Sequence, residues 1–358
     1  MFKKNRKLLI PGPTEVKEEV LLSQAKPMIS HRGQEFSSLY RSIIEKLQSI
    51  LNTKNDVFVL TSSGTGAMEA ATRNFIQKKS LHVGGGEFAK RWYKIAQSNG
   101  KEADLLEVEL GKGVRLKEIK EKLDTGEYDC LFVTHNETST GVLHPIREIG
   151  DLVKNYPDII YCVDAISSLG GTEIKIEEWG IDVLVSSTQK CLAVPPGLAI
   201  AVISEKAFNR AEKVENKGYY FDFLPMKERF DKKGETPATP AISLFYALNC
   251  SLDKILKEGV DNRYKRHLEM ANIVRNWAEN NFGLFAEKEY LSPTLTVVKN
   301  TKEIDVSDFI KQLKEEGFII VNGYGKLKEK TFRIAHMGEL TPNEIEELII
   351  NMNQILSL

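Results

Sequence analysis

The sequence predicts an α/β protein built on a large, mainly parallel sheet, with a smaller α+β domain towards the C-terminal end. From about residue 55 to residue 205, short apolar runs rich in β-branched residues alternate with helical patterns. Several of these runs lack polar alternation, as do strands that are buried on both faces of a parallel sheet. The chain has 358 residues, which is too long for one ordinary core, so we expect two domains of unequal size.

The elements of the expected large sheet follow one another along the chain. Each strand candidate is a short apolar run, and each helix candidate carries apolar residues three to four positions apart. The seven strand candidates are residues 57–61, 81–83, 105–108, 130–134, 159–163, 183–186 and 198–203. The helical patterns between them include residues 67–76, 88–98 and 146–155.

The pattern changes after about residue 205, where longer helices and shorter strands predict the smaller domain. Residues 242–257 and 262–280 have the spacing of long helices. The rest of the chain predicts strand 294–298, helix 306–315, strands 318–321 and 332–335, and helix 342–356. We therefore place the boundary between the two domains near residue 260.

Composition and charge exclude several classes of function. Lys and Arg number 49 against 50 Asp and Glu, so no global field attracts nucleic acid or an anionic membrane. The basic residues 1–7 precede too short an apolar run for a signal peptide, and the apolar run 191–203 is too short to span a bilayer. The four cysteines are scattered without a CxxC pair, which favours reduced thiols over disulfides or a metal site. We expect a cytoplasmic protein without a metal.

A turn rich in hydroxyl groups and glycine is the first feature that carries chemistry. Residues 61–69 (TSSGTGAME) follow a strand candidate and open a helix. Hydroxyls and free N–H groups at a helix N-terminus form a cup for an anion such as phosphate. An ordinary N-cap with a glycine turn is the alternative interpretation. A dinucleotide fingerprint would need a third glycine where Glu69 stands, and the Gly-Lys-Ser/Thr of a phosphate-binding P-loop is absent.

An acid and an amine each follow a buried strand candidate. Asp164 ends the apolar run 159–163, and Lys190 follows the run 183–186. Ligands bind to open α/β sheets at the carboxyl ends of their strands. A buried carboxylate needs a cationic partner, and a desolvated amine becomes nucleophilic enough to form a Schiff base. Taken singly, Asp164 could cap a helix or join an ion pair, and Lys190 could reach solvent.

The anion cup, the acid and the amine together match the phosphate, ring nitrogen and aldehyde of one cofactor. Around these residues the chain resembles the alanine–glyoxylate and serine–pyruvate aminotransferase branch of the class V pyridoxal-5′-phosphate (PLP) aminotransferases. The matching segments are 9–14 (LIPGPT), 28–32 (MISHR), 134–141 (THNETSTG), 163–165 with 168–171, 189–190 with 195–197, 236–240 (TPATP) and 332–334 (FRI). The resemblance therefore covers nearly the whole chain.

The resemblance implies a role for each cofactor-binding position. Lys190 would carry the cofactor as a Schiff base and move the proton, and Asp164 would keep the pyridine nitrogen protonated. Thr138 would bind near the phenolic oxygen, and Gln189 would contact the cofactor beside the lysine. The phosphate would be bound by Ser63, Gly64 and Thr65, and by Thr239 of the other subunit, with Thr236 as a weaker candidate of the same kind.

Substrate recognition and ring stacking are also implied by the resemblance. Arg333 would clamp the substrate carboxylate in a planar, two-point contact. The loop 84–91 (GGGEFAKR) departs from the usual Asn-Gly-aromatic-Gly-x-Arg pattern, so Phe88 would stack on the cofactor unless it is an ordinary core residue. Asn136 stands where several relatives have glycine. The roles of His31, Arg32 and Asn136 stay open.

The resemblance further implies PLP-dependent fold type I, with a large PLP-binding domain of residues 15–260 and a small domain of residues 1–14 and 261–358. It implies a transaminase (EC 2.6.1 type) that moves an amino group from an alanine- or serine-like amino acid to glyoxylate or a 2-oxo acid such as pyruvate. It also implies a homodimer with shared active sites. Alternatives are an aspartate or 2-aminoethylphosphonate transaminase and a PLP lyase or cysteine desulfurase. A desulfurase needs a cysteine in a late loop, and none follows Cys250.

Overall fold

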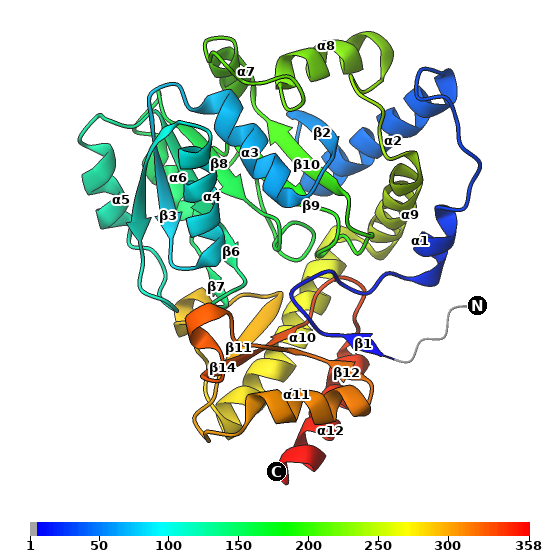
Figure 1. The fold of residues 1–358 in the computed structure, drawn as a ribbon, viewed down its shortest axis with the longest axis vertical. Helices are drawn as coiled ribbons and strands as arrows, with labels where there is room; N and C mark the ends of the chain where they lie inside the picture. Colours follow the sequence, from blue (N-terminus) through cyan, green and yellow to red (C-terminus); the bar gives the residue numbers. More distant parts are fainter. Residues whose placement is uncertain (1–5) are drawn as a thin grey trace.

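A seven-stranded sheet forms the centre of the computed structural model, which describes residues 6–358 (Figure 1). The strand order is β2-β10-β9-β8-β5-β3-β4, and β10 alone pairs antiparallel to its neighbours. The strands are β2 (Asp56–Thr61), β3 (Lys79–Gly84), β4 (Glu102–Glu107), β5 (Cys130–Thr134), β8 (Ile160–Asp164), β9 (Val183–Ser187) and β10 (Leu198–Ile203). The predicted α/β class with a mainly parallel sheet is confirmed, and each of the seven strand candidates overlaps one of these strands.

The sheet is apolar on both faces because alternate side chains of each strand enter different cores. Val57, Val59, Leu131 and Val133 belong to a core that also includes side chains of α2 and α9. Phe58, Leu60, Cys130 and Phe132 belong to a second core with side chains of α3 and α4. Burial on both faces explains why the strands read as continuous apolar runs rather than as alternating patterns.

Helices connect the strands and cover the sheet. Those preceding and within the sheet region are α1 (Glu18–Ser23), α2 (Gln34–Leu51), α3 (Gly64–Phe75), α4 (Glu87–Ser98), α5 (Leu116–Leu123), α6 (Ile146–Val153), α7 (Glu205–Ala211), α8 (Phe223–Lys233) and α9 (Ile242–Glu258). Sequence analysis did not assign α2, although Phe36, Tyr40, Ile43 and Leu47 repeat at helical spacing and are all buried.

A third core lies in the C-terminal part of the chain, below the large sheet in Figure 1. Its elements are α10 (Val260–Asn281), β11 (Leu295–Lys299), α11 (Val306–Glu315), β12 (Phe318–Ile319), β13 (Val321–Asn322), β14 (Thr331–Ala335) and α12 (Pro342–Leu356). Strand β1 (Lys7–Leu8) pairs parallel with β12, so the N-terminal segment joins this part. The division at residue 260 stays a prediction, and residues 1–5 of the expected small domain lie outside the described residues.

One expected strand of this part is divided. The sequence predicts a single strand over residues 318–321, but β12 pairs with β1 and β13 pairs with β14. Between the two strands lies Ile320, whose side chain is 1% exposed in the third core. The chain changes partner at this buried residue, which local apolar pattern cannot show.

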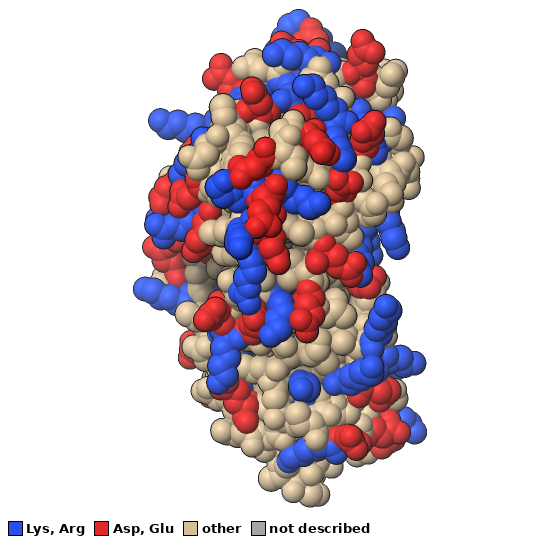
Figure 2. Space-filling view, turned by 90° about the vertical axis from the view of Figure 1, so that its left-hand side faces the viewer, with Lys and Arg blue, Asp and Glu red and all other residues tan. Residues whose placement is uncertain are grey.

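The surface carries charges of both signs. On the face drawn in Figure 2, acidic and basic side chains are interspersed over the whole height of the molecule. Among residues 6–358, no helix is both long enough and apolar enough to cross a membrane.

Candidate active site

Three parallel strands end together and bring the candidate catalytic groups to one edge of the sheet. Strand β8 ends at Asp164, which pairs in register with Thr134 of β5 on one side and Val185 of β9 on the other. Strand β9 ends at Ser187, three residues before Lys190. The carboxyl ends of parallel strands meet at one edge, where open α/β sheets bind ligands.

Asp164 is a buried acid that needs a positive partner. Its side chain is 4% exposed and accepts hydrogen bonds from the Ile166 N–H at 2.8 Å and the Thr134 hydroxyl at 3.5 Å. Burial raises the pKa of Asp164 to about 7, while the Ile166 bond and the charge of Lys190 lower it. A cation or a charged N–H donor placed against this carboxyl would stabilise its ionised form.

Lys190 is a half-buried lysine on which the charge of Asp164 acts. Burial lowers the pKa of Lys190 to about 8, and the charge of Asp164 opposes this effect. The amine donates a hydrogen bond to the carbonyl of Pro11. The lysine side chain lies over Gly12, where an added β-carbon would stand 2.8 Å from the amine nitrogen. Gly12 is therefore required both for this approach and for its φ of +102°.

The residues of the expected anion cup lie at the N-terminus of α3, and their role in binding an anion stays a prediction. Ser63 is the N-cap residue, and its side chain makes no capping bond. Gly64 lies against the turn that follows Asp164, because a β-carbon on it would come within 2.6 Å of the Ile166 side chain. The Arg91 guanidinium donates to the Thr65 hydroxyl at 3.5 Å, which adds a positive charge to the cup.

Glu137 links the loop of Thr138 to the start of α4. The carboxylate of Glu137 is fully buried and accepts bonds from the N–H groups of Phe88 at 3.0 Å and Ala89 at 3.3 Å. It also accepts from the hydroxyl of Ser139 at 2.6 Å. An acid at a helix N-terminus is favourably placed, so Glu137 fixes the backbone that carries Phe88.

The C-terminal part of the chain reaches this edge through Arg333 on β14. The Arg333 guanidinium donates to the carbonyl of Thr138 at 3.3 Å and to the carbonyl of Asn322 at 3.0 Å. It lies 5.4 Å from the centre of the Tyr324 ring, and that ring is 6.4 Å from the ring of Phe88. Arg333, Thr138 and Phe88 are thus brought together from three separate segments.

Thr239 does not join the buried cluster. It is exposed, in a segment attached to β2 by a bond from the Ala241 N–H to the Thr61 hydroxyl at 3.1 Å. Arg32 holds the preceding residues through an ion pair with Glu235 at 3.2 Å and bonds to two backbone carbonyls. Arg32 thus serves the segment that carries Thr239.

Asn136 connects loops. Its amide donates to the Ser167 hydroxyl at 2.9 Å and to the Thr294 hydroxyl at 2.8 Å. The neighbouring His135 binds the Ser168 hydroxyl through its ring at 2.9 Å. Both residues thus tie the loop of Thr138 to the segment that follows Asp164. For the half-buried His31, the structure gives no such role.

Sequence reasoning missed two charged residues of this region. Glu137 and Arg91 both lie inside segments that had been singled out, 134–141 and 84–91. A carboxylate between hydroxyl residues, and an arginine one helical turn after Phe88, were the available clues. Their partners, Phe88 and Thr65, lie in other segments of the chain, so neither contact follows from local spacing.

Comparisons with known proteins find similarity over nearly the whole chain. Residues 14–349 match the model of the family described as aminotransferase class-V. The chain is 43% identical to an uncharacterized aminotransferase of Methanocaldococcus jannaschii, over 94% of this chain and 89% of that protein. It is 33% identical to the L-aspartate–glyoxylate aminotransferase of Paracoccus denitrificans, over 93% and 87% of the two chains. A solved alanine–glyoxylate aminotransferase from Nostoc sp. matches with a TM-score of 0.93 at 28% identity, covering 99% and 96%.

The fold and these likenesses define a PLP-dependent transaminase. The chain belongs to the class V aminotransferase family.

The side chains at the sheet edge fit this cofactor. The Ser187 hydroxyl and the Gln189 side-chain oxygen are buried without a hydrogen-bond partner among the described residues. Such atoms are costly unless a bound group satisfies them. Together with the acid at Asp164 and the free helix N-terminus at Ser63, they provide partners for a polar ring with a phosphate arm.

The lowered pKa of Lys190 generates a testable expectation. In cofactor-free protein, acylation of Lys190 should rise with pH about a midpoint near 8, because only the neutral amine is nucleophilic. The neutral fraction grows as pH rises through this pKa, well before an ordinary lysine value of 10.5 is reached. Peptide mass spectrometry over a pH series measures it, with Lys117, whose side chain is 87% exposed, as internal reference. A midpoint near the ordinary value would contradict the expectation.

Proposed function

We propose that this enzyme transfers the amino group of a small amino acid, alanine- or serine-like, to glyoxylate or a 2-oxo acid such as pyruvate. The observation that carries the proposal is the placement of the buried Asp164 and the half-buried Lys190 at one edge of the sheet, with Arg333 brought to the loop of Thr138 by β14. An amine, an acid and a carboxylate-binding guanidinium are the groups that transamination of an α-amino acid requires.

The cofactor would be held by residues that follow several strands at one edge of the large sheet. Ser63, Gly64 and Thr65 would bind the phosphate at the start of α3, where backbone N–H groups and the helix dipole favour an anion. The bound cofactor supplies an aldehyde that takes up the amino group and a ring that accepts electrons. Phe88 would stack on the ring, Thr138 would bind near the phenolic oxygen, Gln189 would contact the cofactor beside the lysine, and Asp164 would hold the ring nitrogen.

The chain's own groups would then act as follows. Lys190 would hold the cofactor and move a proton at the substrate α-carbon, for which a pKa of about 8 is suited. Asp164 would stay ionised by accepting a hydrogen bond from the protonated ring nitrogen. Arg333 would bind the α-carboxylate through a planar fork, and its partial burial would limit competition from water.

The donor and the acceptor are inferred from the relatives. The Paracoccus relative and the Nostoc structure are both named for glyoxylate, one with aspartate and one with alanine. Aspartate is the second candidate donor, because Arg91 adds a guanidinium 4.7 Å from the Phe88 ring that could receive a second carboxylate. No contact in the structure favours 2-aminoethylphosphonate.

A cysteine desulfurase or related lyase is disfavoured by the thiols. Burial raises the pKa values of Cys130 and Cys162 well above the ordinary range and that of Cys191 to about 12. Cys191 is next to Lys190, but its thiol donates to the carbonyl of Ser167 at 3.5 Å. A protonated thiol held in this way is a poor nucleophile.

We further propose a cytoplasmic homodimer with shared active sites. Thr239 is exposed beside an apolar groove lined by Tyr219 and Pro237, and the Tyr219 side chain is 93% exposed. Covering these side chains with a second copy would remove apolar surface from water and bring Thr239 towards the partner's phosphate site. The large domain would be residues 15–260, and the small domain residues 1–14 and 261–358. Four free cysteines suit a reducing compartment.

The reaction and the cofactor lysine can be tested together. Borohydride treatment of the loaded protein, followed by peptide mapping, should place the pyridoxyl label on Lys190. Mixing the loaded protein with alanine or serine alone should release a 2-oxo acid and leave the amine on the cofactor, with neither ammonia nor sulfide. A label on another lysine, or release of ammonia, would overturn the proposal.

Arg333 gives a test of substrate binding. Arg333→Lys keeps the charge but loses the planar two-point contact, so donor efficiency should fall roughly 10- to 150-fold. Cofactor absorbance should not change. The matched control is Arg275→Lys, since Arg275 is also from the C-terminal part and binds the carbonyls of Leu291 and Ser292 and the side-chain oxygen of Asn272. The measurement compares how strongly each protein prefers an amino donor over the decarboxylated analogue of that donor. If the wild type and the variant show the same preference, the carboxylate site lies elsewhere.

The shared site predicts complementation between two defective chains. Lys190→Ala and Thr239→Ala proteins should each have weak activity at limiting PLP. In a mixed dimer, the subunit that retains Lys190 would receive the intact Thr239 of its partner and regain one complete site. Activity of the re-associated mixture at limiting PLP measures this, with each variant re-associated alone as control. Absence of recovery in a mixture shown by sedimentation to contain mixed dimers would contradict the shared site.

A further inference from the structure

The backbone around Lys190 is held at four successive carbonyl groups, those of residues 189–192. Thr14 donates to Gln189 from its N–H at 3.0 Å and to Lys190 from its hydroxyl at 2.9 Å. The next carbonyl, that of Cys191, accepts from Arg263 at 2.5 Å, and the Leu192 carbonyl accepts from the Ser251 hydroxyl, also at 2.5 Å. The loop then passes through Ala193 at a φ of +51°, a left-handed conformation that non-glycine residues adopt only when surrounding contacts impose it.

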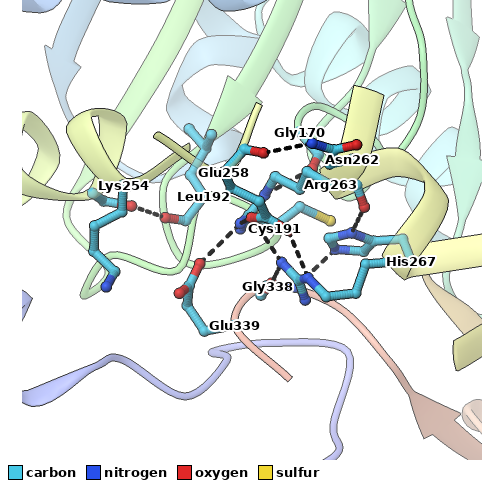
Figure 3. Close-up of polar contacts among 12 residues, drawn as sticks. Gly170, Cys191, Leu192, Lys254, Glu258, Asn262, Arg263, His267, Gly338 and Glu339 are labelled. Carbon is cyan, nitrogen blue, oxygen red and sulfur yellow. Dashed lines mark hydrogen bonds and ion pairs between the residues drawn. The ribbon is translucent and has the colours of Figure 1, made fainter. Parts of the chain in front are cut away.

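Arg263 is the charged member of this set and is completely buried. Figure 3 shows its guanidinium at the centre of a polar network between α10 and the loops of Gly170 and Cys191. It donates to the Gly170 carbonyl at 3.1 Å, in the segment that follows Asp164. Its charge is balanced by ion pairs with Glu258 at 2.7 Å and Glu339 at 2.9 Å. Because all of these partners compensate the burial of the charge, the guanidinium is held in one defined position.

The same network includes the segment that follows β14, the strand of Arg333. His267 accepts a bond from the Gly338 N–H at 3.1 Å and binds the Arg263 carbonyl through its other ring nitrogen at 2.8 Å. Gly338 packs against the lysine loop, since a β-carbon on it would lie 3.5 Å from the Lys190 carbonyl oxygen. Arg263 therefore joins the lysine loop to the chain that carries Arg333.

We propose that Arg263 is a positioning residue that fixes the backbone of Lys190, and with it the direction of the amine, relative to Asp164 and Arg333. The inference rests on the proposed role of Lys190. The planar guanidinium reaches two carbonyls and two carboxylates at once. An ammonium group in its place would be drawn to Glu258 and Glu339, so the carbonyls of Gly170 and Cys191 would lose their donor.

Arg266 provides a matched control one turn along α10. It binds both oxygens of Glu258, at 2.7 and 3.0 Å, and the carbonyls of Gly338 and Leu340. It thus shares the carboxylate and the C-terminal segment with Arg263 but does not contact the loops of Gly170 or Cys191. Arg266→Lys disturbs the same charge network without removing a bond from the lysine loop.

The first measurement uses cofactor-free protein and does not depend on catalysis. Amide exchange of Ala193 and Val194, whose N–H groups bond within the loop to Lys190 and Thr188, reports its opening. In Arg263→Lys their exchange should be at least roughly tenfold faster than in wild type, because a buried carbonyl has lost its donor. In Arg266→Lys it should stay near the wild-type rate. Equal exchange in the two variants would overturn the proposal.

The second measurement uses the loaded enzyme. In Arg263→Lys the pH midpoint of the cofactor's visible absorbance should shift, and kcat of the donor half-reaction should fall roughly 10- to 100-fold with KM nearly unchanged. A purely structural role would lower thermal stability in both arginine variants and leave the absorbance midpoint unmoved. An unmoved midpoint with a normal kcat in Arg263→Lys therefore contradicts a positioning role.

Two further results keep the test decisive. If Arg263→Lys does not fold, Ser251→Ala removes the donor to the adjacent Leu192 carbonyl with little change in volume, and it should show the same shifts to a smaller extent. Unchanged exchange and absorbance in Ser251→Ala would then count against the proposal. Borohydride mapping of the wild-type protein separates failure of the proposed function from failure of the positioning role. A label on a residue other than Lys190 refutes the proposed function. Amide exchange of the loop in Arg263→Lys does not depend on that function and tests the positioning role by itself.

Discussion

Withdrawal of an acid and an amine from water at one edge of the sheet is the constraint on which the rest of the structure depends. Removing either charge from water is expensive unless a partner compensates, and here both Asp164 and Lys190 have their pKa values moved towards the neutral form. The ends of β8 and β9 place the two residues at the same edge of the sheet. The pair is thereby left in a state that a polar, charged ligand can stabilise, which explains why unsatisfied oxygens remain at Ser187 and Gln189.

The chain surrounds this pair with segments that are distant in sequence. The Pro11–Gly12 turn near the N-terminus meets the lysine amine, and β14 near the C-terminus brings Arg333 to the loop of Thr138. Between them, Glu137 fixes the start of α4 beneath Phe88. Each contact uses a backbone group on one side, so loop conformation rather than side-chain choice alone determines the geometry of the site.

The sequence predicts the sheet better than the site. Strands such as β5 and β10 coincide with their predicted ranges because a strand buried on both faces is a continuous apolar run, which is visible in the local sequence. The residues of the cofactor site were found only through a joint pattern and a family resemblance. Glu137 and Arg263 were not found, because their partners lie in other segments and no local spacing encodes a contact across the chain. The division of the expected strand 318–321 at Ile320 was not predicted for the same reason.

The antiparallel strand β10 separates two electrostatic environments along one edge of the sheet. After β2 the chain enters α3 almost directly, so the proposed phosphate site lies at the positive end of a helix. After β9 the chain instead turns back through residues 188–197 into β10, so no helix begins beside Lys190. The direction of β10 therefore leaves the positive end of a helix dipole at the proposed phosphate site and none beside Lys190. The amine is thus not repelled by a helix dipole. The one antiparallel strand of the sheet thus gives the two ends of the proposed cofactor site different electrostatic environments.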